Sequence, residues 1–205
     1  MKIGLLVDGE AEFRALPKLI ERIIIPNQVV KTLRADLQPL SPDVRIIKEV
    51  EKKIPIFTGK NVDIVIVLLD RENRTESPSK WVEEINKVAV KSRRCSGVQT
   101  VFVIKDRTFE NWLLSDISTV ASIKGRYTVS KALRSKIEPN KADGNLVIDL
   151  MKKAAKKEGY SKVRDAVFIL SKANADKIAA NSRSFRRFMR VLGYQPYANQ
   201  SCLPV

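Results

Sequence analysis

Short apolar runs alternate with segments of helical periodicity in the first half of the chain. Four runs are typical of buried strands, because they are short, rich in apolar residues and bounded by polar or turn-forming residues. They cover residues 3–7, 29–33, 62–69 and 99–104. Apolar positions at helical spacing predict amphipathic helices over residues 12–25, 43–54 and 81–90. Pro17 is expected to delay the regular part of the first helix to about residue 16.

The second half of the chain has no convincing strand pattern. A helix is expected to begin over residues 108–116, and others cover residues 130–136, 145–157, 161–172, 175–180 and 184–192. Strands that alternate with helices predict a parallel α/β sheet flanked by helices. We therefore expect an α/β core over residues 1–125 and a helical C-terminal extension over residues 126–205, packed on the same domain.

The composition excludes several classes of enzyme. The chain has no histidine, which excludes a Ser-His-Asp triad, a His-Glu-x-x-His zinc site and an imidazole general base. Cys95 and Cys202 form no Cys-x-x-Cys pair, so a structural zinc site is not expected. No apolar run approaches the ~20 residues that span a membrane, and the first residues do not resemble a signal peptide. We expect a cytoplasmic protein with no membrane partner.

Positive charge is concentrated in the second half of the chain. Residues 1–100 carry 18 basic and 14 acidic side chains, a balance of +4, whereas residues 101–205 carry 20 and 9, a balance of +11. Clustered lysines and arginines favour a polyanion such as nucleic acid, because they displace counterions from its phosphates. A well-solvated surface is the alternative interpretation.

Acidic residues follow three of the predicted strands. These are Asp8, Glu10 and Glu12 after the first strand, Asp70 and Glu72 after the third, and Asp106 and Glu110 after the fourth. Parallel strands present their carboxyl ends at the same edge of a sheet, where ligands bind. Carboxylates gathered there repel one another, and a hard divalent cation with oxygen ligands would compensate them. The pattern therefore predicts a Mg²⁺ or Mn²⁺ site that hydrolyses phosphodiester bonds.

The acids differ in how strongly they favour this chemistry. We predict Asp8, Glu12, Asp70 and Glu72 as metal ligands and Glu110 as a supporting catalytic acid. Strand ends and first helical turns also favour acids for structural reasons, which is the alternative for each of them. Lys105 and Arg107 are predicted to bind a phosphate, or else to balance the acids nearby.

Four short segments resemble motifs of a known family. Residues 7–12 (VDGEAE) resemble the Glu-Gly-x-x-Glu element of Toprim domains, and residues 69–72 (LDRE) resemble their Asp-x-Asp element. Residues 110–116 (ENWLLSD) and 184–188 (SFRRF) are similar to segments of compact bacterial Toprim-like proteins of unknown function, which are related to the OLD-family nucleases. The resemblance runs from about residue 3 to residue 193, with the four motifs in the family's order.

This resemblance implies a Toprim-like catalytic core that cleaves DNA or RNA with Mg²⁺ or Mn²⁺. It also implies a role in genome defence, alongside an ATPase partner protein. Asp8 stands where the family has Glu, and Glu72 stands where it has Asp. A noncatalytic nucleic-acid-binding or partner subunit with a degenerate site is therefore one alternative. A PIN-like ribonuclease, which also gathers carboxylates at parallel strand ends, is another.

Two C-terminal helices are predicted to carry the nucleic-acid contacts. Four arginines recur at positions i, i+3, i+4 and i+7, which places them on one helix face. They are Arg183, Arg186, Arg187 and Arg190. Lys152, Lys153 and Lys156 point away from the apolar stripe of the preceding basic helix. Neither set carries a base-reading signature, so we expect contacts to the phosphate backbone.

Overall fold

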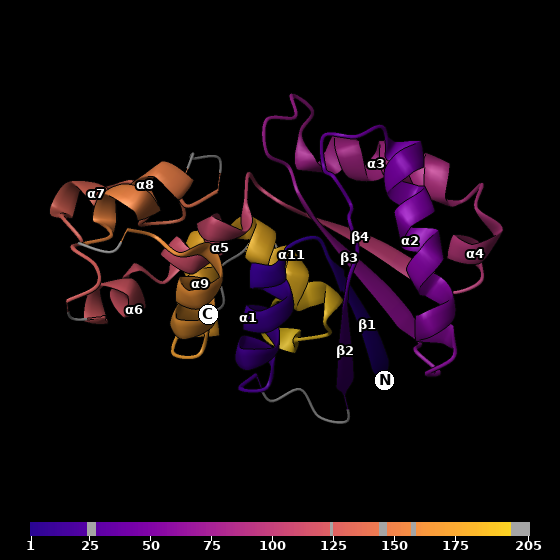
Figure 1. Cartoon of the computed structure of the whole chain (residues 1–205), viewed down its shortest axis with the longest axis horizontal. Coiled ribbons are helices and arrows are strands. Elements are labelled where there is room, and N and C mark those ends of the chain that lie inside the picture. The colour runs from indigo at the N-terminus through magenta and orange to yellow at the C-terminus, as the bar shows by residue number, and fades with distance from the viewer. Residues whose placement is uncertain (24–27, 124, 144–146, 157–158, 198–205) are drawn as a thin grey trace.

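A four-stranded parallel sheet forms the centre of the computed structural model (Figure 1). The structure describes residues 1–23, 28–123, 125–143, 147–156 and 159–197. The strands are β1 (Lys2–Val7), β2 (Val29–Arg34), β3 (Ile64–Asp70) and β4 (Gln99–Lys105). They lie in the order β2-β1-β3-β4, and every adjacent pair is parallel. The predicted α/β class and the four predicted strands are confirmed.

Helices cover both faces of this sheet. One face packs against α2 (Asp43–Thr58), α3 (Pro78–Ala89) and α4 (Arg93–Ser96). The other face packs against α1 (Glu10–Ile20), α5 (Phe109–Ser115), α9 (Lys162–Leu170) and α11 (Arg183–Val191). The remaining elements are α6 (Ile117–Ser122), α7 (Lys131–Ser135), α8 (Val147–Ala154), α10 (Ala175–Asn181) and the 3₁₀ helix Gln195–Tyr197. In Figure 1, α6, α7 and α8 lie beside the layered part, on the side away from α2 and α4.

Side-chain alternation along the strands decides which residues reach the edge of the sheet on the α1 face. Ile64, Ile66 and Leu68 belong to the hydrophobic cluster on that face. Asp70 continues this series at the same spacing, because successive strand residues point to opposite faces. Asp70 is also paired in register with Lys105 on β4. The strand pattern alone therefore places a carboxylate and an ammonium group side by side.

The first helix departs from its prediction. It begins at Glu10, runs through Pro17 and ends at Ile20. The prediction that Pro17 delays the helix is wrong. The Glu12 carboxylate accepts a hydrogen bond from the Gly9 amide at 2.8 Å, and this cap fixes the first turn ahead of the proline. The predicted continuation to residue 25 lies partly outside the described residues.

Other helices agree with their predictions in place but not always in length. The helix predicted over residues 43–54 extends to Thr58 and includes Pro55. The short helices α4 and α6 were not predicted. The predicted ends of the helix over residues 145–157 lie outside the described residues, and α8 covers the part between them. Within the described chain, no helix combines the length and the apolar character needed to cross a membrane.

The C-terminal helices share a core with the sheet. Trp112 on α5 contacts the Phe185 and Phe188 rings of α11, with ring centroids 5.1 and 5.2 Å apart. The Trp112 indole donates a hydrogen bond to the Ser184 hydroxyl at 2.8 Å. One continuous cluster of buried residues extends from Ile3 on β1 through these rings. The helical extension is thus held to the α/β core by buried aromatic side chains.

Candidate active site

The predicted acids lie at the point of the sheet where the order of successive strands reverses its direction. The chain passes from β1 outward to β2, then crosses back over β1 to β3 and continues outward to β4, so the switch point lies between β1 and β3. Ligands of open α/β sheets bind outside the carboxyl ends of the strands at such a point. Asp8 follows β1 and Asp70 ends β3. Glu12 on α1 and Glu110 on α5 approach from the helices above this edge. We call Asp8, Glu12, Asp70, Glu72 and Glu110 the acid edge.

A buried lysine lies within the acid edge. The Lys105 ammonium forms an ion pair with the Glu12 carboxylate and lies 2.9 Å from Asp70 Oδ1. Its side chain has no exposed surface. Burial lowers the pKa of Lys105 to about 7, although the carboxylates of Asp8 and Glu110 oppose this shift. The predicted phosphate contact of Lys105 is therefore corrected, since the ammonium is enclosed by acids and is not accessible to a polyanion.

Both carboxylate oxygens of Glu12 are engaged by the protein. Oε1 contacts Lys105, and Oε2 accepts the Gly9 amide hydrogen. Glu12 therefore connects the start of α1 to the end of β4. In this arrangement it orients Lys105, and the predicted metal-ligand role would require one of these contacts to open.

Burial and neighbouring carboxylates act in the same direction on Asp70. Burial raises the pKa of Asp70 well above its usual range, and the nearby carboxylate of Glu110 raises it further. Glu72 and Asp8 add to this effect, while Lys162 opposes it. Burial also raises the pKa of Glu72, with the Asp8 carboxylate as the next contribution. The structure thus brings together carboxylates that are up to 102 positions apart in the sequence, from Asp8 to Glu110.

The C-terminal extension adds two residues to the acid edge that the sequence analysis missed. The Tyr160 hydroxyl donates a hydrogen bond to Glu110 Oε1 at 3.2 Å, and the Lys162 ammonium lies 3.7 Å from the same oxygen. Glu110 has no exposed surface, and its Oε2 atom has no hydrogen-bond partner within the described chain. Burial, followed by the charge of Glu110, raises the pKa of Tyr160. No sequence motif marked these residues, because they approach Glu110 through the packing of α9 on α1 and α5.

Backbone geometry orients the loops of the acid edge. Glu72 and Arg107 both have positive φ angles, 48° and 81°. The Glu72 amide donates to the Arg107 carbonyl, and the Arg107 guanidinium donates to the Glu72 carbonyl, both at 2.8 Å. Asp8 Oδ1 accepts the Leu37 amide hydrogen at 2.8 Å. Unusual backbone conformations of this kind concentrate at functional sites. One nitrogen of Arg107, a predicted phosphate contact, is committed to holding Glu72.

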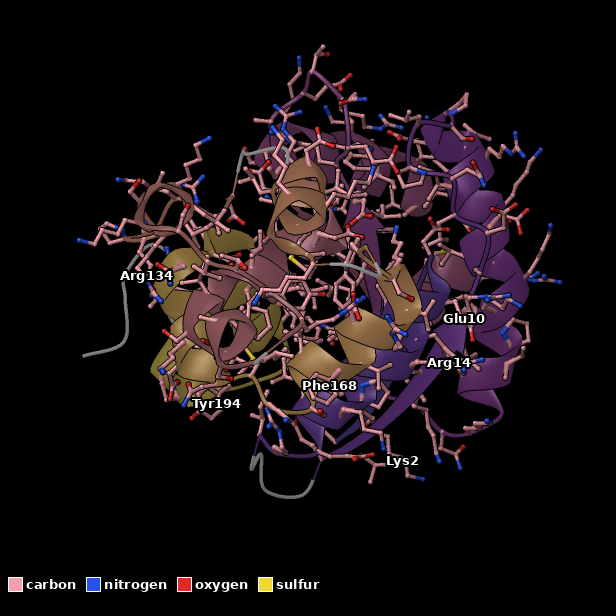
Figure 2. The ribbon with its side chains drawn as sticks, turned by 60° about the vertical axis from the view of Figure 1, so that its left-hand side comes forward. Lys2, Glu10, Arg14, Arg134, Phe168 and Tyr194 are labelled. Atoms are coloured by element: carbon pink, nitrogen blue, oxygen red, sulfur yellow. The ribbon has the colours of Figure 1, made fainter. Side chains whose placement is uncertain are left out.

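Glu10 lies outside this group. Its carboxylate forms ion pairs with Arg14 and Arg34 on the surface. Figure 2 shows Glu10 and Arg14 next to one another on the outward side of α1, well away from Arg134 on the helical extension. The hydrogen bond from Arg14 lowers the pKa of Glu10. Glu10 is therefore a structural acid of the first helical turn.

The acid edge has the donor atoms for a hard cation, but they do not form a closed cage. Across the described ranges, no three His, Cys, Asp or Glu side chains are positioned to hold one metal ion together. Protein Mg²⁺ sites commonly use one or two carboxylates and complete their coordination with water and phosphate oxygens. Asp70 and Glu72, whose carboxylates repel each other, meet this smaller requirement. The hydrogen-bond-free Oε2 of Glu110 is a further oxygen that a cation would satisfy.

The predicted basic residues are not equally accessible. Lys152, Lys153 and Lys156 are exposed, as are Arg183 and Arg190, whereas Arg187 is half-buried. Arg186 is only 1% exposed and donates hydrogen bonds to the Ala179 carbonyl and to Asn140 Oδ1. The predicted nucleic-acid contact of Arg186 is therefore wrong. Its guanidinium connects the buried Ala179 carbonyl of α10 to the Asn140 side chain.

Comparison with known proteins gives one match. No curated protein and no solved structure matches the chain. A family model described as "Domain of unknown function (DUF4276)" matches residues 7–193. This span includes the whole acid edge, the residues Tyr160 and Lys162 that cover it, and all of α11. Because the match extends over most of the sequence, the chain belongs to the DUF4276 family of domains of unknown function.

Proposed function

We propose that the protein is a divalent-metal-dependent nuclease that hydrolyses phosphodiester bonds at the acid edge. One observation carries the proposal: acids from three strand ends lie together at the switch point, where burial, followed by the charges of Glu110, Glu72 and Asp8, raises the pKa of Asp70 well above its usual range. An arrangement that only stabilised the fold would not gather like charges in a buried position. Such gathered and perturbed acids are typical of functional sites.

The balance of charge supports a cation. The five carboxylates of the acid edge face two ammonium groups, Lys105 and Lys162. Asp70 and Glu72 would hold Mg²⁺ or Mn²⁺ together with water and phosphate oxygens, with Asp8 and Glu110 as supporting acids beside them. A bound cation would supply Lewis acidity toward phosphate oxygens, which makes an imidazole base unnecessary in this histidine-free chain.

The chain's own residues have separable roles in this proposal. Lys105 and Glu12 hold the Asp70 carboxylate in place from the buried side. Lys162 is 55% exposed beside Glu110, so it reduces the repulsion of an incoming phosphate from the solvent side. The exposed residues Lys152, Lys153 and Lys156 of the helical extension would attract the nucleic acid over a longer range. The likeness of residues 7–12 and 69–72 to Toprim motifs supports the same chemistry, and with it the proposed ATPase partner and defence role.

The direct test is removal of one charge from the acid edge. Asp70→Asn should abolish Mg²⁺- or Mn²⁺-dependent cleavage of DNA and RNA substrates, while nucleic-acid binding in EDTA is unchanged. Asp149→Asn is the matched control, since Asp149 is an exposed acid on α8 outside the acid edge. It should cleave like the unmodified protein. Equal cleavage by both variants would reject the assignment of the acid edge. A PIN-like ribonuclease would share this metal dependence and differ in accepting RNA alone.

A noncatalytic nucleic-acid-binding or partner subunit is the second candidate. The observation that favours it is the engagement of both Glu12 oxygens by Lys105 and Gly9, which closes one predicted ligand position. The altered acids Asp8 and Glu72 in the Toprim-like motifs favour it as well. Titration calorimetry with Mg²⁺ and Mn²⁺ distinguishes the candidates. Absence of binding heat, together with absence of nicking on any substrate, would favour the noncatalytic subunit.

A further inference from the structure

A cavity of about 450 Å³ lies beside the edge strand β4, between α3 and α11. Its walls include Ser77 and Ser79 at the start of α3, and Arg183 and Arg187 on α11. Phe102 and Ile104 of β4 form the apolar part of the lining. The cavity is large enough for a nucleotide-sized group. It is separate from the acid edge, because no residue of the acid edge lines it and its β4 residues point to the α3 face, whereas Lys105 points to the α1 face.

The two arginines of this cavity have no counterion among the residues that the structure describes. Arg183 and Arg187 are four positions apart on one helix, so their side chains lie on the same wall. Neither side chain forms an ion pair or a hydrogen bond with any residue in the described part of the chain. Burial, followed by the charge of Arg190, lowers the pKa of Arg187. A half-buried guanidinium with a like charge beside it is costly unless an anion approaches.

The acids that line the same cavity are occupied by other groups. Asp106 Oδ1 lies 2.6 Å from Arg71 Nη2 in an ion pair. Asp143 accepts hydrogen bonds from the Ser184 amide at 2.7 Å and from the Ser182 hydroxyl at 2.8 Å. Glu83 is exposed at the rim on α3 and would repel an anion there. The positive charge that remains open is therefore on the α11 wall.

The cavity is connected to the acid edge through adjacent residues. Arg71 directly follows Asp70, and Asp106 directly follows Lys105. The Arg71–Asp106 ion pair thus links the two strand ends that carry the central contact of the acid edge. A nucleic-acid strand whose scissile bond lies at the acid edge would pass over this pair toward the cavity.

We infer that the cavity between α3 and α11 binds a phosphate group of a nucleotide, held by the guanidinium groups of Arg183 and Arg187. The hydroxyl groups of Ser77 and Ser79 face the phosphate as neutral donors from the opposite wall. The identification of this phosphate with a neighbouring nucleotide of the substrate strand rests on the proposed nuclease function. The anion site itself does not, because it is defined by the cavity and its open charge.

The test measures binding in EDTA, where metal-dependent cleavage does not contribute. A short fluorescein-labelled oligonucleotide is titrated with the unmodified protein and with the double variant Arg183→Gln/Arg187→Gln. Two lost charge-assisted hydrogen-bonding groups should weaken binding by about tenfold or more. Arg93→Gln is the matched control, since Arg93 is exposed on α4 and does not line the cavity. It should weaken binding by only about twofold, as a distant surface charge does.

Competition identifies the chemical group that is bound. Inorganic phosphate and adenosine monophosphate should displace the oligonucleotide from the unmodified protein, and the double variant should lose this competition. A 5′-phosphorylated oligonucleotide that binds more tightly than its 5′-hydroxyl form would identify a terminal phosphate as the occupant.

Equal weakening by the Arg93 variant and the double variant would overturn the inference, as would failure of both phosphate and adenosine monophosphate to compete. These outcomes are distinct from failure of the proposed nuclease function. Loss of cleavage with an intact phosphate site would reject only the catalytic proposal.

Discussion

Replacement of Lys105 by methionine tests the central contact of the acid edge. Methionine keeps the length of the side chain and removes the ammonium group that lies between Glu12 and Asp70. Both carboxylates then remain buried without a counterion. Removing one partner of a buried ion pair costs about 3–5 kcal/mol, because the remaining charge is uncompensated. We expect a loss of this size in the free energy of unfolding at pH 7.

The destabilisation caused by Lys105→Met should depend on pH in a defined direction. An acid whose pKa is raised in the folded state binds a proton more readily there than in the unfolded chain, so its protonation on acidification favours folding. The pKa of Asp70 is already raised, first by burial and then by Glu110, and loss of Lys105 should raise it further. The destabilisation of Lys105→Met should therefore be smaller at pH 5 than at pH 7.

The titration of Lys105 itself makes the stability of the unmodified protein depend on pH above about 7. Burial lowers its pKa from 10.5 to about 7, so the folded state binds fewer protons than the unfolded chain between these values. The stability of the unmodified protein should consequently rise as the pH increases from about 7 toward 10.5, and Lys105→Met should lack this rise.

Urea denaturation followed by tryptophan fluorescence measures these effects, because Trp81 and Trp112 are both buried. Lys80→Met is the matched control. The Lys80 side chain is 64% exposed and lies 4.0 Å from Glu84, so its removal should change stability by less than about 1 kcal/mol. A Lys105→Met variant that is as stable as this control at pH 7, or equally destabilised at pH 5, would refute the reasoning.

Two further substitutions test the packing that supports the site. Asp165→Asn should lower the free energy of unfolding by about 2 kcal/mol at pH 7, because the Asp165 carboxylate lies 2.6 Å from Arg126 Nη2 and accepts the Tyr127 hydroxyl at 2.7 Å. Burial raises the pKa of Asp165, but the Arg126 hydrogen bond and the other partners outweigh it, so the pKa is lowered. The unmodified protein should therefore lose this stabilisation as the pH falls below 3.8. Urea denaturation at pH 7 and pH 3 checks both effects. Gly4→Ala should destabilise by about 1–3 kcal/mol, because a Cβ atom would lie 2.6 Å from the Phe57 ring. An unchanged melting temperature would contradict that packing.

The fold was largely predictable because its strands are short apolar runs separated by amphipathic helices. The failures occur where local rules were outweighed by other contacts. Pro17 lies inside α1 because the hydrogen bond between the Gly9 amide and Glu12 fixes the first turn of the helix ahead of the proline. Arg186 is buried although its spacing places it with the other arginines of α11. The buried carbonyl of Ala179 on α10 offers it a partner, and this depends on helix packing that no single-helix pattern contains.

The candidate site was predictable only for the residues that strand ends locate. Asp8 and Asp70 could be located from the rule that parallel strands end at one edge, since the rule requires only strand positions. The role of Lys105 follows from strand register, which aligns it with Asp70 and is not encoded in the hydrophobic pattern. Tyr160 and Lys162 reach Glu110 from a helix that is distant in sequence. Contacts of this kind become visible only when the helical extension is packed on the core.

Comparison of two buried acids shows why Lys105 alone does not complete the site. Asp165 and Asp70 each lie within 3 Å of a basic group, Arg126 and Lys105 respectively. The pKa of Asp165 is nevertheless lowered, whereas that of Asp70 is raised. Burial raises the pKa of both acids. At Asp165 the hydrogen bonds from Arg126, Ser161 and Tyr127 outweigh it, whereas at Asp70 the charges of Glu110, Glu72 and Asp8 add to it. A structural ion pair of the Asp165 type would account for Lys105 but not for the additional acids. The negative charge that remains is what a divalent cation would neutralise.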